Sequence, residues 1–482
     1  MSAAALLYDA RRIVPLAWPV FVGQVAVLAF GTVDTLIASR ASSLDLAALA
    51  IGSAVYVTVF IALMGLVLAV GPIAGQLFGA GKHVEAGAQL HQAMWLALAA
   101  SVVGCMLLLF PQPFLNLSQA APEVAAKVRG YLTALAFALP STLLFTAFRG
   151  FNTAVSRPKI VMLLQLGALG LKIPMSALLV FGFSAGGLQL PAQGAPGCGM
   201  ATAIVMACQL GAAWWLLRHD PFYARFGLHG KVSRPHRASL RGLLRLGIPM
   251  GASIAIEVTG FTFMALFISR IGTTPVAGHQ IALNMLSILF MLPLSIGNAT
   301  STLVAQRIGA NDSAQAAQLG WNGLRLGVIV ATVMGCVVYA LRLPILHAYT
   351  NNASVIAAAL PLLTWLVLFH IADAAQIIAA FILRAYHIGT VPVLIYAAAI
   401  WGVGLGGGYV LAFNVSGLSP LALRGAPGYW AAATAGLILA GLGLCGFLAW
   451  MLRRRNQTAV PREARERPQA DDIRRPPPEG YE

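Results

Sequence analysis

The chain contains an internal duplication, because residues 16–90 and 246–320 align at a constant offset of 230 without a gap. Chance matches of Ala, Leu and Val mean little in so apolar a chain, but rarer residue types match in the same register. These matches are Pro19 with Pro249, Ser39-Arg40 with Ser269-Arg270, Ala47 with Ala277, and Gln76-x-x-Gly79-Ala80 with Gln306-x-x-Gly309-Ala310. In a membrane protein, such a duplication predicts a transporter of two pseudo-symmetric halves with the substrate site between them.

Composition indicates a membrane protein. Hydrophobic residues make up 59% of the chain and charged residues only 10%, whereas a soluble domain has roughly 25% charged residues. Twelve apolar stretches are long enough to cross a hydrocarbon core of about 30 Å, and the glycine-rich stretch around 404–408 is the weakest part of them. They lie near 14–38, 46–71, 91–110, 124–148, 160–183, 198–217, 246–269, 276–304, 319–341, 355–383, 392–415 and 427–452. The sequence therefore predicts an all-α membrane protein of twelve transmembrane helices in two pseudo-symmetric six-helix bundles.

The net charge of +16 follows from the predicted topology. Of the 31 Lys and Arg residues, 23 fall on the loops and tails that share one side of the membrane with the N-terminus. Cytoplasmic loops carry this excess in membrane proteins, so we expect both termini in the cytoplasm. Nucleic-acid binding, the other common cause of a high positive charge, is disfavoured.

Four regions are expected along the chain. Residues 1–217 form the N-terminal six-helix bundle and 246–452 the C-terminal one, with equal orientation because each has an even number of spans. The 218–245 segment is a basic cytoplasmic connection, either an amphipathic helix on the inner leaflet or a plain basic loop. The charged, Pro-rich tail at 453–482 is predicted to be disordered.

Three acidic residues lie inside predicted spans, namely Asp34, Glu257 and Asp373. A charge at membrane depth costs at least about 2–3 kcal/mol, so such acids face a partner or a water-filled cavity. A carboxylate can also avoid the cost by taking up a proton or binding a cation, which is the coupling step of an ion-driven transporter. The alternative for each acid is a purely structural hydrogen bond or salt bridge.

Several segments resemble one known family. They are TVDTLIASR around Asp34, LAALAIGSAVY at 46–56, IPMGASIAIEVTGF around Glu257, and the block beginning PVAGHQIALNMLSILF at 275. Together they resemble the NorM-like branch of the multidrug and toxic compound extrusion (MATE) family over roughly 12–450. The resemblance implies a bacterial inner-membrane antiporter that exports amphipathic, often cationic drugs or dyes in exchange for H⁺ or Na⁺.

The resemblance also implies roles for single residues. Asp34 is the proton-linked acid, and Glu257 and Asp373 form a pair that shares one proton or, if Na⁺ is the coupling ion, one metal cation. Gln280 and Asn284 would supply neutral oxygen atoms near this pair. No cofactor is expected beyond the coupling ion, and we expect a monomer surrounded by membrane lipid.

Two departures from the family pattern favour a proton over sodium. In the fifth span, Lys172 and Ser176 stand where the family has two Asn residues facing the first-span acid. We expect Lys172 to pair with Asp34, because an ammonium beside a carboxylate competes with Na⁺ for it. In the tenth span, Phe369 replaces a residue that is often Tyr, which removes another oxygen from the neighbourhood of Asp373.

A set of interior aromatic and methionine side chains could form an adaptable pocket for varied apolar ligands. The set is Phe261, Met264, Met285, Phe290 and Met291. The alternative for each of them is ordinary packing in a core or against lipid.

Three other functions compete with drug export. A lipid-linked precursor flippase of the same superfamily would present several cations to its cavity, but only Lys172 and Arg325 lie within spans. A major-facilitator transporter also has six plus six spans, but the connection GQLFGAGKHVEAG lacks that family's Asp-Arg-x-Gly-Arg type motif. A membrane enzyme is disfavoured because no nucleophile motif, paired-His pattern or nucleotide loop is present.

Overall fold

The computed structural model describes residues 3–118, 121–185 and 188–463. In these ranges it contains 12 helical segments long and apolar enough to cross a membrane, which confirms the predicted spans. Those of the N-terminal half are α1 (Ala3–Ala41), α2 (Ser43–Leu68) with α3 (Val70–Gly79), α4 (His83–Leu109), α6 (Pro122–Ala154), α7 (Pro158–Phe181) and α8 (Ala195–His219). Those of the C-terminal half are α9 (Arg237–Ser269), α10 (Thr273–Gly309), α11 (Ser313–Ala340), α13 (Ala353–Ala385), α14 (Thr390–Tyr396) with η2 (Ala397–Gly406) and α15 (Gly407–Ala412), and α16 (Ala426–Glu463).

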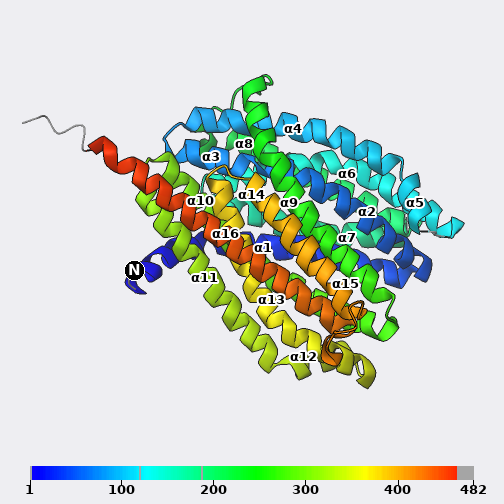
Figure 1. Ribbon diagram of the computed structural model, residues 1–482. Helices are drawn as coiled ribbons and strands as arrows, with labels where there is room; N and C mark the ends of the chain where they lie inside the picture. The colour runs from blue at the N-terminus through cyan, green and yellow to red at the C-terminus, as the bar shows by residue number, and fades with distance from the viewer. Residues whose placement is uncertain (1–2, 119–120, 186–187, 464–482) are drawn as a thin grey trace, which may run out of the picture.

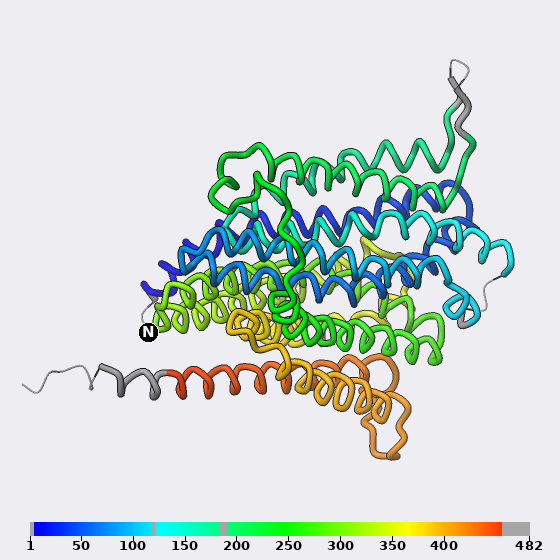
Figure 2. Tube along the Cα trace, turned by 90° about the horizontal axis from the view of Figure 1, so that it is seen from above, coloured from blue at the N-terminus to red at the C-terminus, as the bar shows by residue number. Residues whose placement is uncertain are grey.

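The two halves repeat each other element by element. α4 begins at His83 and its counterpart α11 at Ser313, and the short helices α5 (Gln112–Ser118) and α12 (Arg342–Tyr349) also begin 230 positions apart. The duplication therefore extends beyond the segment in which matching residues are recognisable. In Figure 2 the blue-to-green half and the yellow-to-red half lie side by side, with their long helices roughly parallel.

The first helix belongs to both halves. Along its length α1 packs against α7 of its own half and against α10 and α11 of the other half. Ile13 and Ala17, near its start, are buried in the hydrophobic core of the C-terminal half. In Figure 1 the N-terminus accordingly lies beside α11.

Several boundaries differ from the sequence-based prediction. α9 begins at Arg237, where the His236 side chain accepts a hydrogen bond from the Ser239 amide, so the end of the predicted 218–245 connection is already helical. α16 continues to Glu463, into the segment predicted to be disordered, and residues 464–482 lie outside the described part. A two-stranded hairpin, β1 (Phe183–Ala185) with β2 (Leu188–Leu190), follows α7 in an otherwise helical architecture.

The glycine-rich eleventh span does form a helix across the membrane, although its middle is π-helical over Ala397–Gly406. Gly404 and Gly436 face each other's chain, and a Cβ added to Gly436 would overlap the Ala399 carbonyl oxygen. The glycines therefore let η2 and α16 pack backbone against backbone. π-helical segments are rare and often occur at functional sites.

The connection between the halves is anchored to the N-terminal half. It contains the short 3₁₀ helix η1 (Pro221–Phe226) rather than a long amphipathic helix. Arg157 pairs with Asp220 at 2.6 Å, and the buried Tyr223 hydroxyl donates to Asn152 Oδ1 at 2.6 Å. The loop between α6 and α7 is thereby fixed to the connection.

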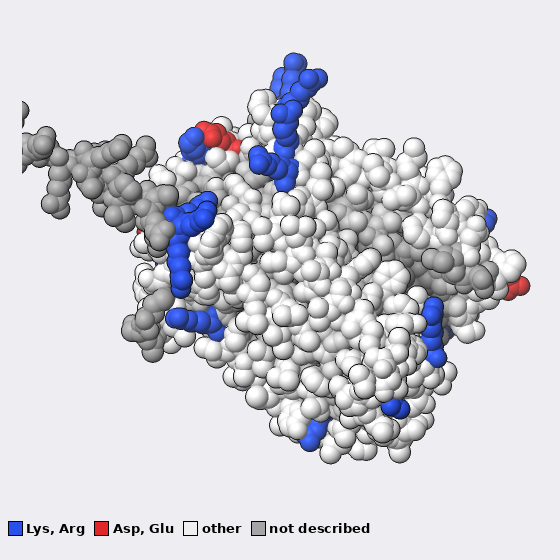
Figure 3. Space-filling model, in the orientation of Figure 1, with Lys and Arg blue, Asp and Glu red and all other residues white. Residues whose placement is uncertain are grey.

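The surface matches a membrane protein. Figure 3 shows a broad uncharged band on one face, with most of the visible Lys and Arg side chains toward the end at which α1 begins and α16 ends. A few basic side chains mark the opposite end. The uncharged band is what a hydrocarbon environment requires of the surface that faces it.

The Asp220–Arg157 pair makes a testable contribution to stability. Partial burial opposes ionisation of Asp220, but the Phe222 amide and the Arg157 guanidinium outweigh it and hold the pKa of this carboxyl below its ordinary value. A lowered folded-state pKa stabilises the protein above the unfolded-state pKa, and this stabilisation is lost as the pH falls through the folded-state value. We expect Asp220→Asn to cost about 1 kcal/mol at pH 7. Thermal unfolding in detergent should show the difference from wild type shrinking below about pH 4, and a difference independent of pH would contradict this.

Candidate functional site

The first site is a buried ion pair in the N-terminal half. Lys172 Nζ lies 2.8 Å from Asp34 Oδ1, and the two side chains are 0% and 8% exposed. Asp34 comes from the C-terminal part of α1 and Lys172 from the middle of α7, so the pair joins two helices that pack against each other. The structure thus brings together the two residues that the sequence analysis pairs.

All three N–H groups of Lys172 have an acceptor. Besides Asp34, the ammonium donates to the Cys198 carbonyl oxygen at 3.0 Å and to Thr202 Oγ1 at 2.7 Å, both on α8. Ser176 Oγ, one helical turn after Lys172, donates to Asp34 Oδ1 at 3.3 Å. An ammonium has exactly three donors, so this site leaves none of them without a partner.

The second site is a carboxylate pair in the C-terminal half. Gln376 Nε2 donates to Glu257 Oε1 at 3.2 Å and to Asp373 Oδ1 at 2.9 Å, so both carboxylates lie around one amide nitrogen. The Tyr396 hydroxyl donates to Gln376 Oε1. Glu257 and Asp373 are 8% and 3% exposed, and Gln376 and Tyr396 are fully buried. The two predicted acids therefore lie on different helices, α9 and α13, and share Gln376 as a neighbour.

Sequence analysis missed the residues that hold this pair. Gln376 lies three positions after Asp373 on the same face of α13, and this spacing could have revealed it. Tyr396 ends α14, directly before the π-helical part of the eleventh span, and nothing in the sequence connects it to the acids. Arg384 is a third omission, because this buried guanidinium, expected on a cytoplasmic loop, acts electrostatically on Glu257.

The structure does not bring Gln280 and Asn284 into hydrogen-bond contact with the acid pair. Both side chains are exposed on α10, and no described hydrogen bond joins either of them to Glu257 or Asp373. The amide oxygen near the acid pair comes from Gln376 instead. The reason is helical phase, because the buried face of α10 presents Ile281, Ala282 and Leu286 to the core.

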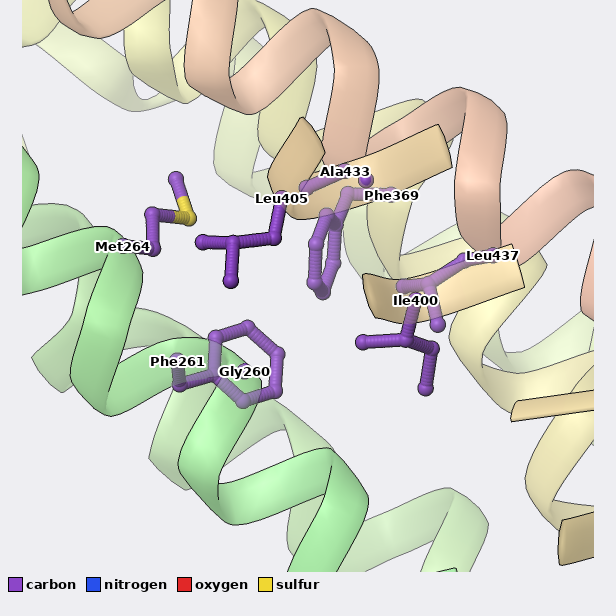
Figure 4. A pocket seen from close by; sticks show the side chains of 9 residues that line it. Gly260, Phe261, Met264, Phe369, Ile400, Leu405, Ala433 and Leu437 are labelled. Carbon is purple, nitrogen blue, oxygen red and sulfur yellow. The ribbon is translucent and has the colours of Figure 1, made fainter. Parts of the chain in front are cut away.

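A small apolar cavity of about 30 Å³ lies beside the second site. Its lining residues come from α9, α13, η2 and α16, and Figure 4 shows their side chains converging on it. Phe261, Met264 and Phe369 are among them, and Phe369 packs against Phe261 with ring centroids 5.8 Å apart. Glu257 precedes Phe261 by one helical turn, and Asp373 follows Phe369 by one turn, so the acids lie one turn from the cavity.

The other members of the predicted pocket lie elsewhere. Phe290 packs against the hydrophobic cluster of the C-terminal half that contains Ile378. Met285 packs against a separate cluster that contains Leu363. Met291 does not line this cavity. The five residues are spread over the length of α9 and α10, which is why they do not converge on one pocket.

Comparison with known proteins decides the family. Residues 19–178 and 249–410 match the MatE family model. The chain is 39% identical to a probable multidrug resistance protein NorM of Aromatoleum aromaticum, over 93% of this chain and 95% of that protein. It is 34% identical to the multidrug resistance protein NorM of Vibrio cholerae, over 92% of this chain and 96% of that protein. The chain belongs to the MATE family.

Solved MATE transporters share the fold. The eukaryotic MATE transporter AtDTX14 superposes with a TM-score of 0.82 at 19% identity, over 94% of this chain and 99% of that one. The Vibrio cholerae MATE transporter VcmN in its bent form gives a TM-score of 0.80 at 17% identity, over 94% and 99%. The resemblance to the NorM-like branch and the twelve-helix architecture are thus confirmed, and this MATE protein is a multi-pass transporter.

The buried ion pair predicts a specific pattern of stability. In Lys172→Met the side chain keeps its approximate size, but Asp34 loses its counter-charge, and breaking a buried pair in this way costs about 3–5 kcal/mol. The loss should be smaller at low pH, because a proton on Asp34 removes the unpaired charge. The double variant Asp34→Asn/Lys172→Met should recover part of the stability. Thermal unfolding in detergent at pH 5 and pH 8 measures both effects, and equal losses in the single and double variants would refute the pairing energy.

Proposed function

We propose that this MATE transporter is a bacterial inner-membrane multidrug efflux antiporter that exports amphipathic or cationic compounds in exchange for protons. The observation that carries the proposal is a carboxylate site within the spans of each half, surrounded by its own polar partners in otherwise apolar helices. Carboxylates at membrane depth are costly and mark ion pathways. Multidrug resistance proteins from several bacteria, similar over more than nine-tenths of the chain, support the drug substrate.

The first site favours a proton as the coupling ion. The Lys172 ammonium already occupies a position 2.8 Å from the Asp34 carboxylate oxygen, and a second cation there would be repelled. A proton on Asp34 needs no such space, and it weakens the attraction that holds α1 to α7. Loading and release of the proton would therefore bias α1 between two arrangements.

The second site can store a cation or a proton between its acids. In the described arrangement, the NH₂ group of Gln376 donates to both carboxylates and so lies where a bound cation would lie. A proton shared by Glu257 and Asp373 would serve the same purpose, because two carboxylates this close do not both stay charged in a low dielectric. Na⁺ at this site would need the Gln376 oxygen, which accepts from Tyr396 here.

The apolar cavity suits part of the substrate. Phe261, Met264 and Phe369 offer aromatic faces and a flexible thioether, which adapt to varied apolar bodies. The acid pair one helical turn away would attract a positively charged group of the same molecule. Gln280 and Asn284, polar and exposed at membrane depth, are best accommodated by a water-filled space between the halves rather than by lipid. They would then contact the polar parts of the substrate.

The flippase alternative finds less support. Binding the phosphates of a lipid-linked precursor requires cations that are free to contact them, and each N–H of the buried Lys172 is already engaged. The excess of Lys and Arg at one end of the molecule supports termini in the cytoplasm. Export would then proceed from that side.

Asp34 is expected to be essential for export. Asn keeps the shape of the side chain but cannot take up a proton, so Asp34→Asn should lower proton-driven dye transport at least tenfold in everted membrane vesicles. Asp45→Asn is the matched control, because Asp45 is also a buried, lysine-paired acid of the N-terminal half, 2.6 Å from Lys127. Transport should follow an imposed ΔpH and persist without Na⁺. Transport driven by Na⁺ after ΔpH is abolished would overturn proton coupling.

Glu257 and Asp373 are expected to act as one unit. Glu257→Gln and Asp373→Asn should each reduce transport at least tenfold, and the double variant should cost little more, because residues of one site are not additive. The measurement is initial dye uptake into everted vesicles, normalised to folded transporter. Partial losses that multiply in the double variant would show two separate sites.

A further inference from the structure

The duplicated Gln-x-x-Gly-Ala motif meets its own copy in the fold. The first copy ends α3 and the second ends α10, and these two helices pack against each other across the boundary between the halves. They do so at the end of the bundle that carries most Lys and Arg residues, which is the predicted cytoplasmic end. The two copies of the motif therefore meet each other at the boundary between the pseudo-symmetric halves.

Two reciprocal hydrogen bonds cross this boundary. Gln76 Nε2 donates to the Ala385 carbonyl oxygen, which ends α13 of the opposite half, at 2.7 Å. Gln306 Nε2 donates to the Ala154 carbonyl oxygen, which ends α6 of the opposite half, at the same distance. The last carbonyls of a helix lack partners within it, so each glutamine caps a helix that belongs to the other half. Gln306 also donates to Ser156 Oγ at 2.9 Å.

The two glycines of the motif bring the main chains into contact. A Cβ atom on Gly79 would overlap the main chain of Gln306, and a Cβ atom on Gly309 would overlap that of Gln76. One turn earlier, a Cβ atom on Gly75 would lie 3.1 Å from the Ala305 Cβ atom. No side chain larger than hydrogen fits at either crossing, which accounts for glycine in both copies.

Other contacts between the halves lie toward the same end. The buried Asp9 carboxylate of α1 accepts a hydrogen bond of 2.6 Å from Asn322 of α11. Gly65 of α2 packs directly on the main chain of Gly251 in α9. Among the described residues, the hydrogen bonds that join the halves through side chains gather here, so this end is closed.

We propose that Gln76, Gly79, Gln306 and Gly309 form the inner gate of the transporter, a pseudo-symmetric clasp that must open in each cycle to admit substrate from the cytoplasm. The direction in which substrate passes this gate rests on the proposed efflux function. The gate itself rests only on the contacts between the two halves. The glutamines are positioning residues that contact neither the proton sites nor the cavity. Because the clasp is built from main-chain contacts and two capping bonds, it can separate without exposing a charge.

A disulfide tests whether the clasp must open. In a chain whose five cysteines are replaced by alanine, Gly75→Cys with Ala305→Cys places two Cβ atoms slightly closer than the 3.5–4.5 Å typical of a disulfide. Oxidation should cross-link the halves and lower dye transport at least tenfold, and a reductant should restore it. The two single-cysteine variants are the controls, and oxidation should not change their rate of dye transport. If fully cross-linked protein transported dye as fast as the same protein with its disulfide reduced, the gate proposal would be wrong.

Hydrogen exchange tests the glutamines without any substrate. Each of Gln76→Leu and Gln306→Leu removes one capping bond and should accelerate amide exchange at 76–82 and 306–312 by roughly 2- to 12-fold, with the double variant near the product. Gln92→Leu is the matched control, because Gln92 is a buried glutamine whose bonds go to the Arg234 carbonyl oxygen and the His236 amide in the connection, away from the clasp. Exchange at the clasp equal to wild type, or equally fast in the control, would overturn the role of the glutamines. Faster exchange in a protein that moves no dye would keep the gate and reject the efflux proposal.

Discussion

Hydrocarbon supplies neither counter-charge nor hydrogen bonds, so a charged side chain at membrane depth must find both within the protein. The N-terminal half meets this requirement with one compact cluster. Asp34 of α1, Lys172 of α7 and two oxygen atoms of α8 surround each other, and the cluster leaves no donor of the ammonium unused. Three helices are thus positioned by the need to neutralise one carboxylate. A change in the charge of Asp34 therefore changes the contacts that hold all three helices together.

The C-terminal half meets the same requirement with different chemistry. The position equivalent to Asp34 is Met264, which lines the apolar cavity. The acids lie instead on α9 and α13, where an amide rather than an ammonium donates to both of them. The Lys172 ammonium repels a second cation from Asp34, whereas the uncharged Gln376 amide can be displaced from the acid pair by a cation or a proton. The two halves therefore offer unequal sites on equal scaffolds.

The clasp shows the opposite pattern, because there the two halves have kept the same residues. A glutamine and a glycine in each copy make equivalent contacts with the other half. Motion of one half against the other needs matched surfaces, and the glycine crossings permit no side chain to vary. Ion binding has no such need, which allowed the polar clusters to diverge. Symmetry is thus retained at the proposed gate and lost at membrane depth, where the ion sites lie.

The sequence alone determined the number of the spans, the duplication, and the three acids at membrane depth, and it predicts the orientation of the spans. Each of these follows from a rule that acts locally or along the chain, such as the length of a span or the cost of a charge in lipid. The pairing of Lys172 with Asp34 was also within reach, because few cations occur inside spans. Tertiary structure alone decided that Gln376 and Tyr396 surround the acid pair, whereas Gln280 and Asn284 make no described hydrogen bond to it. These contacts depend on helical phase and on how the helices pack around the acid pair, and neither can be read from the sequence alone. The same holds for the duplicated glutamines, whose partners are carbonyl groups that lie close only when the two halves meet.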